Sequence, residues 1–322
     1  MSKSSENTPT SVQLIDIGEG SDGQRIDNFL VTLLKGVPKS RIYRILRKGE
    51  VRVNKGRIKP EYRLKIGDQV RIPPIRLSES GQNKITPSGH ALDWIDNSIL
   101  YEDDHLLILN KPSGIAVHGG SGMSHGVIEA LRAKRPKAPY LELVHRIDRE
   151  TSGCLMIAKR RSMLRRLHEL LREGGMDKSY LTLLQGQWQK GKCKIDLSLQ
   201  KNVLSSGERM VKVDESGKSS LSLFEPVTIY KHASLMRVEI FTGRTHQIRV
   251  HAAHSGHPVA GDSRYGDKEF NKAMRKKGLK RLFLHAHSLS FVLEEPRKEV
   301  DISAPLPDDL RAVIDQLDKE SK

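Results

Sequence analysis

The sequence LVHRIDRETSG, residues 143–153, is the most informative stretch of this chain. It places one carboxylate, Asp148, between Arg146 and Arg149, where an apolar strand is expected to run into a Thr-Ser-Gly turn. A carboxylate flanked by guanidinium groups is favoured in its charged form. A charged carboxylate at a strand end suits covalent or general-base chemistry, although an Asp here also commonly hydrogen-bonds its own turn. If the strand continues to Asp148, Arg146 and Asp148 lie on one face and His145 on the other.

Composition limits the class of protein. The 322 residues contain 55 Lys and Arg against 39 Asp and Glu, giving a net charge of +16, and 37% of them are apolar. This length is typical of two domains, and the basic excess favours a polyanionic partner, nucleic acid before membrane. The sequence has no run of 18 apolar residues and no signal-peptide pattern at its start, so we expect no membrane association. With only two cysteines, these features predict a cytoplasmic protein without a disulfide scaffold.

Patterning divides the chain near residue 80. We expect a flexible tail over residues 1–20, a small basic module over 21–76 and a linker over 77–98, followed by a catalytic-sized domain over 99–322. Between residues 25 and 76 there are 15 Lys or Arg against 4 Asp or Glu, so this short segment supplies most of the net charge.

Helical spacing of apolar residues predicts one helix from Ile26 to Leu34, and Pro38 and Gly49 bound a second one. A turn at 54–56 predicts a hairpin. Basic side chains follow one side of the second helix with few compensating acids, which favours phosphate contact over a merely solvated surface. The predicted RNA contacts of this module are Lys39, Arg41, Arg44, Arg47, Lys48 and Arg52.

Three further segments of the second domain carry polar groups. Tyr180 begins a predicted strand, where it is able to stack on a base or to be an ordinary half-buried tyrosine. The segment from residue 243 to 262 predicts a helix that Thr245 caps and Gly256 ends, with Ile248 and Arg249 side by side in its first turn. A glycine-rich loop over 110–122 is suited to cradle phosphate or to be simply flexible.

Two other kinds of site are less well supported. The sequence GMSHG, residues 122–126, matches the Gly-x-Ser-x-Gly motif of serine hydrolases, but no strand leads into Ser124 as that motif requires. Histidines at 246, 251, 254 and 257 raise the question of a metal site. Only His251 and His254 share a helix face, and no carboxylate or thiolate lies among the four, so we expect no metal.

These segments resemble two known families. The pattern from Gly23 to Val70 is similar to an S4-type RNA-binding domain along its whole length. From Tyr101 to about Pro305 the chain resembles the ribosomal-RNA pseudouridine synthases, through the HRID and TSG motifs, Lys178-x-Tyr180 with Gly186, GRTHQIRVH at 243–251 and RLFLHA at 281–286. The resemblance implies an α+β fold: an S4-like (αL) domain, then a mixed α/β catalytic domain built on a largely antiparallel sheet.

The resemblance also implies a reaction, the isomerisation of uridine to pseudouridine without a cofactor or metal. Asp148 would be the essential carboxylate, Tyr180 would stack on the target base and Arg249 would pair with Asp148. Extruding a base from folded RNA costs a few kcal/mol, and an aromatic ring and a guanidinium suit that task. The remaining implied RNA contacts are Arg146, which would enter the RNA where the uridine leaves, His145, Arg244, and Ile248 as an apolar wall.

Within the family, this domain order occurs in a C-type and a D-type branch, and the chain resembles the C-type branch, which acts on several uridines of 23S rRNA. A D-type enzyme with other target uridines is the alternative, as is a non-catalytic rRNA-binding assembly protein that keeps the fold. We expect 23S rRNA or a large-subunit precursor particle as the partner, and a monomeric enzyme.

Overall fold

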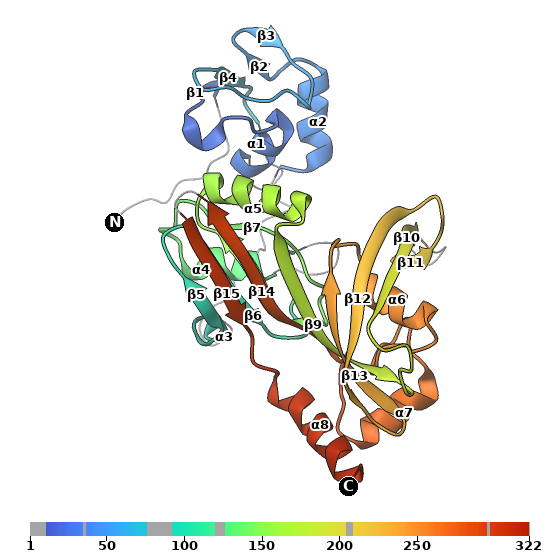
Figure 1. Ribbon diagram of the computed structural model, residues 1–322. Helices are drawn as coiled ribbons and strands as arrows, with labels where there is room; N and C mark the ends of the chain where they lie inside the picture. Colours follow the sequence, from blue (N-terminus) through green and yellow to red (C-terminus); the bar gives the residue numbers. More distant parts are fainter. Residues whose placement is uncertain are drawn as a thin grey trace. The chain divides into compact units, whose positions relative to one another are not determined.

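The structure is a computed structural model that describes residues 11–34, 37–75, 92–119, 126–203, 209–294 and 297–321. It forms two compact units, Met1–Ile85 and Thr86–Lys322, called here the small unit and the large unit (Figure 1). Most of the predicted linker and Ser124 of the hydrolase-like motif lie outside the described residues. No helix in the described ranges is both long and apolar enough to cross a membrane.

The small unit packs two helices against a four-stranded sheet of order β1-β4-β2-β3. Its elements are β1 (Gln13–Asp16), a 3-10 turn (Glu19–Ser21), α1 (Ile26–Leu33), α2 (Lys39–Arg47), β2 (Arg52–Val53), β3 (Gly56–Arg57) and β4 (Gln69–Ile72). Both helices lie where apolar spacing predicted them. Ile26, Leu30 and Ile42 form part of a fully buried core beneath the sheet.

Two features of the small unit complete its sheet. Asn54 and Lys55 have φ of 49° and 66°, the left-handed backbone that a two-residue hairpin loop between β2 and β3 requires. The expected tail contributes β1, because Gln13 to Asp16 pair antiparallel with β4. Ile17, next to this strand, is 3% exposed.

The large unit is built on one extended sheet. In the described ranges its strands run in the order β11-β10-β12-β13-β9-β14-β8-β6-β5, with β15 beside β14 and β7 beside β8. Neighbours pair antiparallel except β8 and β14, which are parallel, so the predicted largely antiparallel architecture is confirmed. The strands are β5 (Ile99–Glu102), β6 (Leu106–Lys111), β7 (Glu142–Leu143), β8 (Ser152–Ala158), β9 (Met176–Gln185), β10 (Cys193–Val203), β11 (Arg209–Val213), β12 (Lys218–Ile229), β13 (Ala233–Ile240), β14 (Leu284–Glu294) and β15 (Arg297–Ser303).

Helices cover both faces of this sheet. They are α3 (Trp94–Asn97), α4 (Val127–Lys134), α5 (Arg161–Glu173), α6 (Gln247–His254), α7 (Lys268–Lys276) and α8 (Asp308–Glu320). Alternate residues of β6 face opposite sides: Leu107 and Leu109 pack in the core that contains α4, and Leu106 and Ile108 in the core that contains α5. This explains the continuous apolar run of β6, since a strand covered on both faces has no solvated side.

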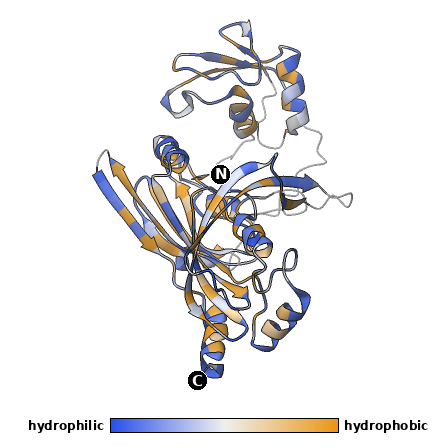
Figure 2. Ribbon diagram, turned by 45° about the vertical axis from the view of Figure 1, so that its right-hand side comes forward, coloured by the Kyte–Doolittle hydropathy of each residue, from blue (hydrophilic) through white to orange (hydrophobic). Residues whose placement is uncertain are grey.

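Two helices extend the core beyond what the patterning indicated. The helix α3 lies in the segment assigned to the linker, and its Ile95 is fully buried in the core of the large unit. The C-terminal helix α8 shows hydrophobic and hydrophilic residues in alternation along its ribbon (Figure 2), because Leu310, Val313 and Leu317 are buried against the sheet while its remaining faces are open.

Candidate active site

Asp148 lies on the turn that connects β7 to β8. The strand predicted to continue to Asp148 in fact ends at Leu143. Beyond Leu143, two histidine rings bond backbone groups that a continued strand pairing would have used. The ring of His145 accepts the N–H of Met156 at 3.1 Å, and the ring of His168 donates to the carbonyl of Val144 at 2.9 Å. The chain then turns, with the N–H of Thr151 donating to the carbonyl of Asp148 at 3.1 Å.

Two close contacts hold this turn in place. Gly153 has φ +107°, and a Cβ there would lie 2.2 Å from the carbonyl oxygen of Ala286 on β14, so only glycine allows the two backbones to approach. Lys111 at the end of β6 is fully buried, and its Nζ donates to the carbonyls of Pro112, Ile115 and Arg149 at 2.8, 2.9 and 3.1 Å. The described part of the glycine-rich loop is therefore tied to the residue after Asp148.

A cleft beside this turn contains the three predicted catalytic residues. Asp148, Tyr180 and Arg249 line it together, although they come from the β7–β8 turn, β9 and α6. Ile248 and the predicted RNA contacts Arg146 and Arg244 line it as well. His145, the remaining RNA contact predicted for the large unit, does not line the cleft, because its ring accepts the backbone N–H of Met156.

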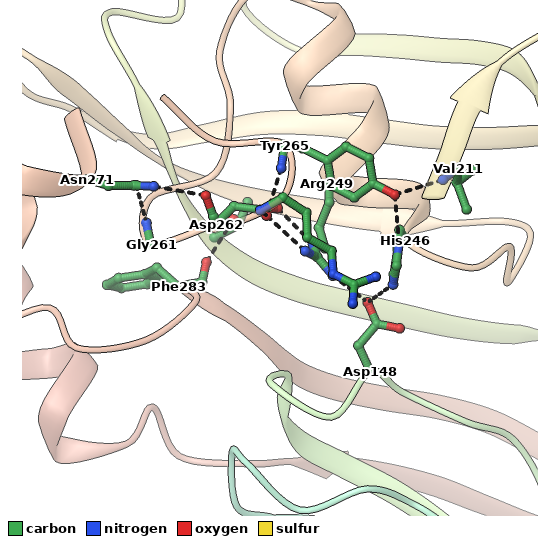
Figure 3. Close-up of polar contacts among 11 residues, drawn as sticks. Asp148, Val211, His246, Arg249, Gly261, Asp262, Tyr265, Asn271 and Phe283 are labelled. Atoms are coloured by element: carbon green, nitrogen blue, oxygen red, sulfur yellow. Dashed lines mark hydrogen bonds and ion pairs between the residues drawn. The ribbon is translucent and has the colours of Figure 1, made fainter. Parts of the chain in front are cut away.

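Arg249 lies within a short chain of ionic contacts (Figure 3). Its Nη1 is 3.4 Å from Oδ2 of Asp148, while its Nε and Nη2 donate to the two carboxylate oxygens of Asp262 at 2.7 and 2.8 Å. Arg249 and Asp262 are 3% and 0% exposed. The stronger pair is therefore with Asp262, which sequence reasoning did not identify, and Asp148 receives the remaining edge of the guanidinium.

Burial and pairing act in opposite directions on these two charges. Burial disfavours the guanidinium, but the hydrogen bonds to Asp262 and the negative charges of Asp262 and Asp148 together outweigh burial and raise the pKa of Arg249. Burial likewise opposes ionisation of Asp262, yet its contact with Arg249 keeps the pKa of that carboxyl below its usual range. The N–H groups of Arg264 and Tyr265 add hydrogen bonds to Asp262 at 2.8 and 3.0 Å. A permanent positive charge is thereby fixed beside Asp148.

Asn271 on α7 holds the Asp262 loop from behind. Its side-chain oxygen accepts the N–H of Gly261 at 2.7 Å, and its side-chain nitrogen donates to the carbonyl of Asp262 at 2.8 Å (Figure 3). A Cβ at Gly261 would lie 2.1 Å from the carbonyl of Arg281, so this position also requires glycine. No signal in the sequence distinguished Asp262 or Asn271 from ordinary loop and helix residues.

The first turn of α6 is formed differently from the prediction. The helix begins at Gln247, and the capping position is His246, in a left-handed conformation with φ 55°, rather than Thr245. The side chain of Gln247 accepts the N–H of Arg244 at 3.0 Å and the hydroxyl of Thr242 at 2.7 Å, which satisfies this end of the segment. The predicted end of the helix at Gly256 is confirmed, with φ +84° just after Ser255.

The other wall of the cleft is apolar. Tyr180 and Ile248 are 8% and 4% exposed and pack in the main core of the large unit. Burial raises the pKa of the Tyr180 phenol, so this ring is neutral and offers a flat surface to a base.

The histidines of the 243–262 segment go to separate places. His251 bonds the hydroxyl of Ser220 at 2.8 Å, His257 bonds the carbonyl of Gln185 at 2.8 Å, and His254 is exposed. Over the ranges that the structure covers, no group of three or more His, Cys, Asp or Glu residues is arranged to hold a metal ion.

The predicted contacts of the small unit lie around α2. Arg44, Arg47, Lys48 and Arg52 are exposed, and Arg41 is half-buried. Lys39 begins α2. Lys48 lies 4.0 Å from Glu50, whereas Arg41, Arg44 and Arg47 pair with no acidic side chain in the described part of the chain. Their charge is available to a polyanion.

Comparison with known proteins identifies the family of the chain. The sequence pattern of the RNA pseudouridylate synthase family matches residues 105–254, and that of the S4 domain matches residues 24–70. The chain is 56% identical to ribosomal large subunit pseudouridine synthase C of Haemophilus influenzae, over 97% of both chains, and 55% identical to the protein of that name from Escherichia coli (strain K12), over 95% of this chain and 97% of that one.

Solved structures show the same fold. The human RNA pseudouridylate synthase domain containing 4 protein superposes with a TM-score of 0.59 at 23% identity, over 70% of this chain and 95% of that one. The human domain containing 1 protein gives 0.57 at 25% identity, over 73% and 96%. The family predicted from the motifs is confirmed: this chain belongs to the RNA pseudouridylate synthases, with an S4 domain ahead of its catalytic domain.

Proposed function

We propose that this enzyme converts particular uridines of the large-subunit ribosomal RNA into pseudouridine, with Asp148 as the reacting carboxylate. The observation that carries the proposal is the meeting of Asp148, Arg249 and Tyr180 in one cleft. The relatives from Haemophilus influenzae and Escherichia coli are named for the large ribosomal subunit, which supports this choice of RNA.

The reaction breaks the bond between N1 of uracil and C1′ of the ribose and forms a bond between C5 and C1′. The proton on C5 is lost and N1 gains one, so no redox step is needed. Asp148 would attack C1′, attack the ring or remove a sugar proton, and each route needs a carboxylate beside the nucleoside. Arg249 would pair with the carboxylate, because its buried positive charge lies 3.4 Å from Oδ2.

The walls of the cleft suit an extruded nucleoside. Tyr180 would stack on the uracil, and Ile248 would exclude water from the ring. Arg146 is exposed at the rim of the cleft, where it would fill the space that the uridine leaves in the RNA. Arg244 would contact the neighbouring backbone. We assign no RNA contact to His145, whose ring bonds the Met156 backbone.

The small unit would supply affinity rather than chemistry. The guanidinium groups of Arg41, Arg44 and Arg47, which pair with no acid among the described residues, would neutralise phosphates together with Lys39, Lys48 and Arg52 and make binding depend on salt. The partner would be 23S rRNA or a large-subunit precursor particle, and the enzyme would act as a monomer in the cytoplasm, with the C-type choice of uridines. D-type uridines are the alternative. A non-catalytic assembly role is less favoured because Asp148 and Tyr180 are both present and face one cleft.

The test is to map pseudouridine across 23S rRNA in a strain that lacks this gene and to complement it with wild type or Asp148→Asn. Wild type should restore specific sites, and Asp148→Asn should restore none while binding RNA with nearly unchanged affinity. Pseudouridine formed by the Asp148→Asn protein would disprove the assignment of the carboxylate. Pseudouridine restored instead at the uridines of a D-type enzyme would show that the chain has the D-type choice of targets.

A further inference from the structure

His246 is the one histidine of its segment that reaches the cleft. Its Nε2 lies 3.8 Å from Oδ2 of Asp148, and its Nδ1 lies 2.8 Å from the hydroxyl of Tyr265 (Figure 3). The backbone of His246 is left-handed, with φ 55°, a conformation that non-glycine residues rarely adopt and that costs energy. Such strain persists where the surrounding contacts require one particular placement of the side chain.

Arg249 and His246 approach the same oxygen of Asp148. The Arg249 Nη1 and the His246 Nε2 lie 3.4 and 3.8 Å from Oδ2. Arg249 is itself fixed by Asp262, so it cannot follow Asp148 if the carboxylate rotates. With Oδ2 held from two sides, Oδ1 is the oxygen left for the substrate.

We propose that His246 is a positioning residue: its Nε2–H, directed at Oδ2 of Asp148, closes on that oxygen when substrate binds and holds it together with the Arg249 guanidinium, so that Oδ1 meets the target uridine, and Tyr265 fixes the His246 tautomer that makes this possible. The inference rests on the proposed uridine isomerisation and adds a named oxygen and two named residues to it.

Hydrogen bonding selects the tautomer. The hydroxyl of Tyr265 accepts the N–H of Val211 at 2.9 Å, so its own hydrogen is free to be donated to Nδ1 of His246. A ring that accepts at Nδ1 carries its proton at Nε2, which faces Asp148. The opposite tautomer would direct two N–H donors at the Tyr265 oxygen and present a lone pair to the carboxylate. Only the first arrangement gives the Tyr265 hydroxyl both a donor and an acceptor and directs an N–H at the carboxylate.

The surroundings favour a neutral ring at neutral pH. Burial lowers the pKa of His246, and the neighbouring Arg249 and Arg264 act in the same direction, while Asp148 and Asp262 oppose them. Burial raises the pKa of Tyr265, so its hydroxyl stays protonated and able to donate. Protonation of His246 would place a full charge beside Asp148. The resulting ion pair would hold the carboxylate more tightly and lower its reactivity.

Two variants of His246 distinguish the effect of its N–H donor from the effect of its bulk. His246→Gln keeps an N–H at a similar reach, whereas His246→Leu keeps the bulk and loses the donor, and both side chains are unbranched at Cβ, as histidine is, on the same left-handed backbone. The 3.8 Å contact is longer than a hydrogen bond, and such contacts in an active site commonly tighten when substrate binds. A hydrogen bond to a charged group contributes about 1.5–3 kcal/mol, so loss of the tightened contact in His246→Leu should lower kcat about tenfold to a hundredfold. His246→Gln should stay within about threefold of wild type, and RNA affinity should be unchanged in both. The control is His254→Gln, an exposed histidine on the same helix.

The pH profile tests the tautomer. Between pH 5 and 8 the wild-type kcat should fall on the acid side with a midpoint below the ordinary histidine value of about 6.5, and His246→Gln should remove this fall. Tyr265→Phe keeps the ring over Arg249 but removes the hydrogen bond to the neutral imidazole. Loss of that bond favours protonation, so the acid limb should move to higher pH.

The assay is release of tritium from RNA that carries [5-³H]uridine, because formation of the C5–C1′ bond expels the C5 proton. Equal kcat for His246→Leu and wild type, an acid limb that survives in His246→Gln, or a Tyr265→Phe profile that does not move upward would each overturn the proposal. Failure of the proposed function is distinguishable, because wild type itself would then release no tritium.

Discussion

Replacing Asp262 with asparagine should destabilise the large unit far more than the same change at Asp309. Both carboxylates accept two hydrogen bonds from one arginine: Arg249 with Asp262 at 2.7 and 2.8 Å, and Arg281 with Asp309 at 2.6 and 3.0 Å. The pairs differ in burial, since the Asp262 side chain is 0% exposed and that of Asp309 is 54% exposed. The comparison therefore varies solvent exposure while the paired arginine is kept, although Asp262 also accepts the N–H groups of Arg264 and Tyr265.

The expected magnitudes follow from this difference. Removing one partner of a buried ion pair costs about 3–5 kcal/mol, because the remaining charge stays desolvated and Arg249 cannot lose its proton. An exposed pair contributes at most about 1 kcal/mol. For a unit of this size each kcal/mol lowers Tm by about 2–4 °C, so Asp262→Asn should lower Tm by roughly 6–20 °C and Asp309→Asn by no more than roughly 4 °C.

Calorimetric unfolding of the full chain measures both effects. Because the pKa of Asp262 is lowered in the folded state, its contribution is complete at neutral pH and is lost only as the pH falls through that lowered value. The difference in Tm between wild type and Asp262→Asn should therefore persist at neutral pH and narrow in acid. Equal Tm changes for Asp262→Asn and Asp309→Asn would show that the buried pair does not organise the site.

Three other outcomes are expected. The double variant Arg44→Gln with Arg47→Gln should weaken RNA binding and reduce the log–log salt slope by about 1.5, and an unchanged slope would mean that these arginines contact no phosphate. Tyr180→Leu should weaken binding or turnover of substrate RNA about fivefold to a hundredfold and Tyr180→Phe much less, since stacking on a base contributes about 1–3 kcal/mol; equal losses would refute stacking. Burial lowers the pKa of Lys111 to about 7, so wild-type unfolding free energy should rise between pH 7 and 9 relative to Lys111→Met, and parallel curves would contradict this.

The small unit was predictable because its signals are local. Apolar spacing located α1 and α2, and the sequence around Asn54 and Lys55 indicated a turn whose left-handed backbone the structure contains. Neighbouring residues determine each of these features. The same holds for Asp148 and Arg249 as candidates, since each lies in a short motif.

The supports of the site were not predictable because they join distant segments. Asp148 and Arg249 are 101 residues apart, and nothing in the sequence indicated that Asp262 would take the stronger pair. Lys111 lies in a loop that looked suited to phosphate, yet its ammonium is used inside the protein. The strand predicted through Asp148 ends at Leu143, and the rings of His145 and His168 bond backbone groups that a longer strand would have paired. Backbone propensity does not predict such side-chain contacts.

The meeting of Gly153 with Ala286 has a consequence for biosynthesis. Ribosomes deliver the chain from its N-terminus, and domains generally fold as they emerge. The strands of the small unit have all emerged once β4 has, whereas the turn of Asp148 is seated against β14, which is translated much later than β4. If the small unit binds RNA as proposed, a nascent chain is able to bind RNA long before its catalytic turn is in place. A truncated product would then bind ribosomal RNA without modifying it.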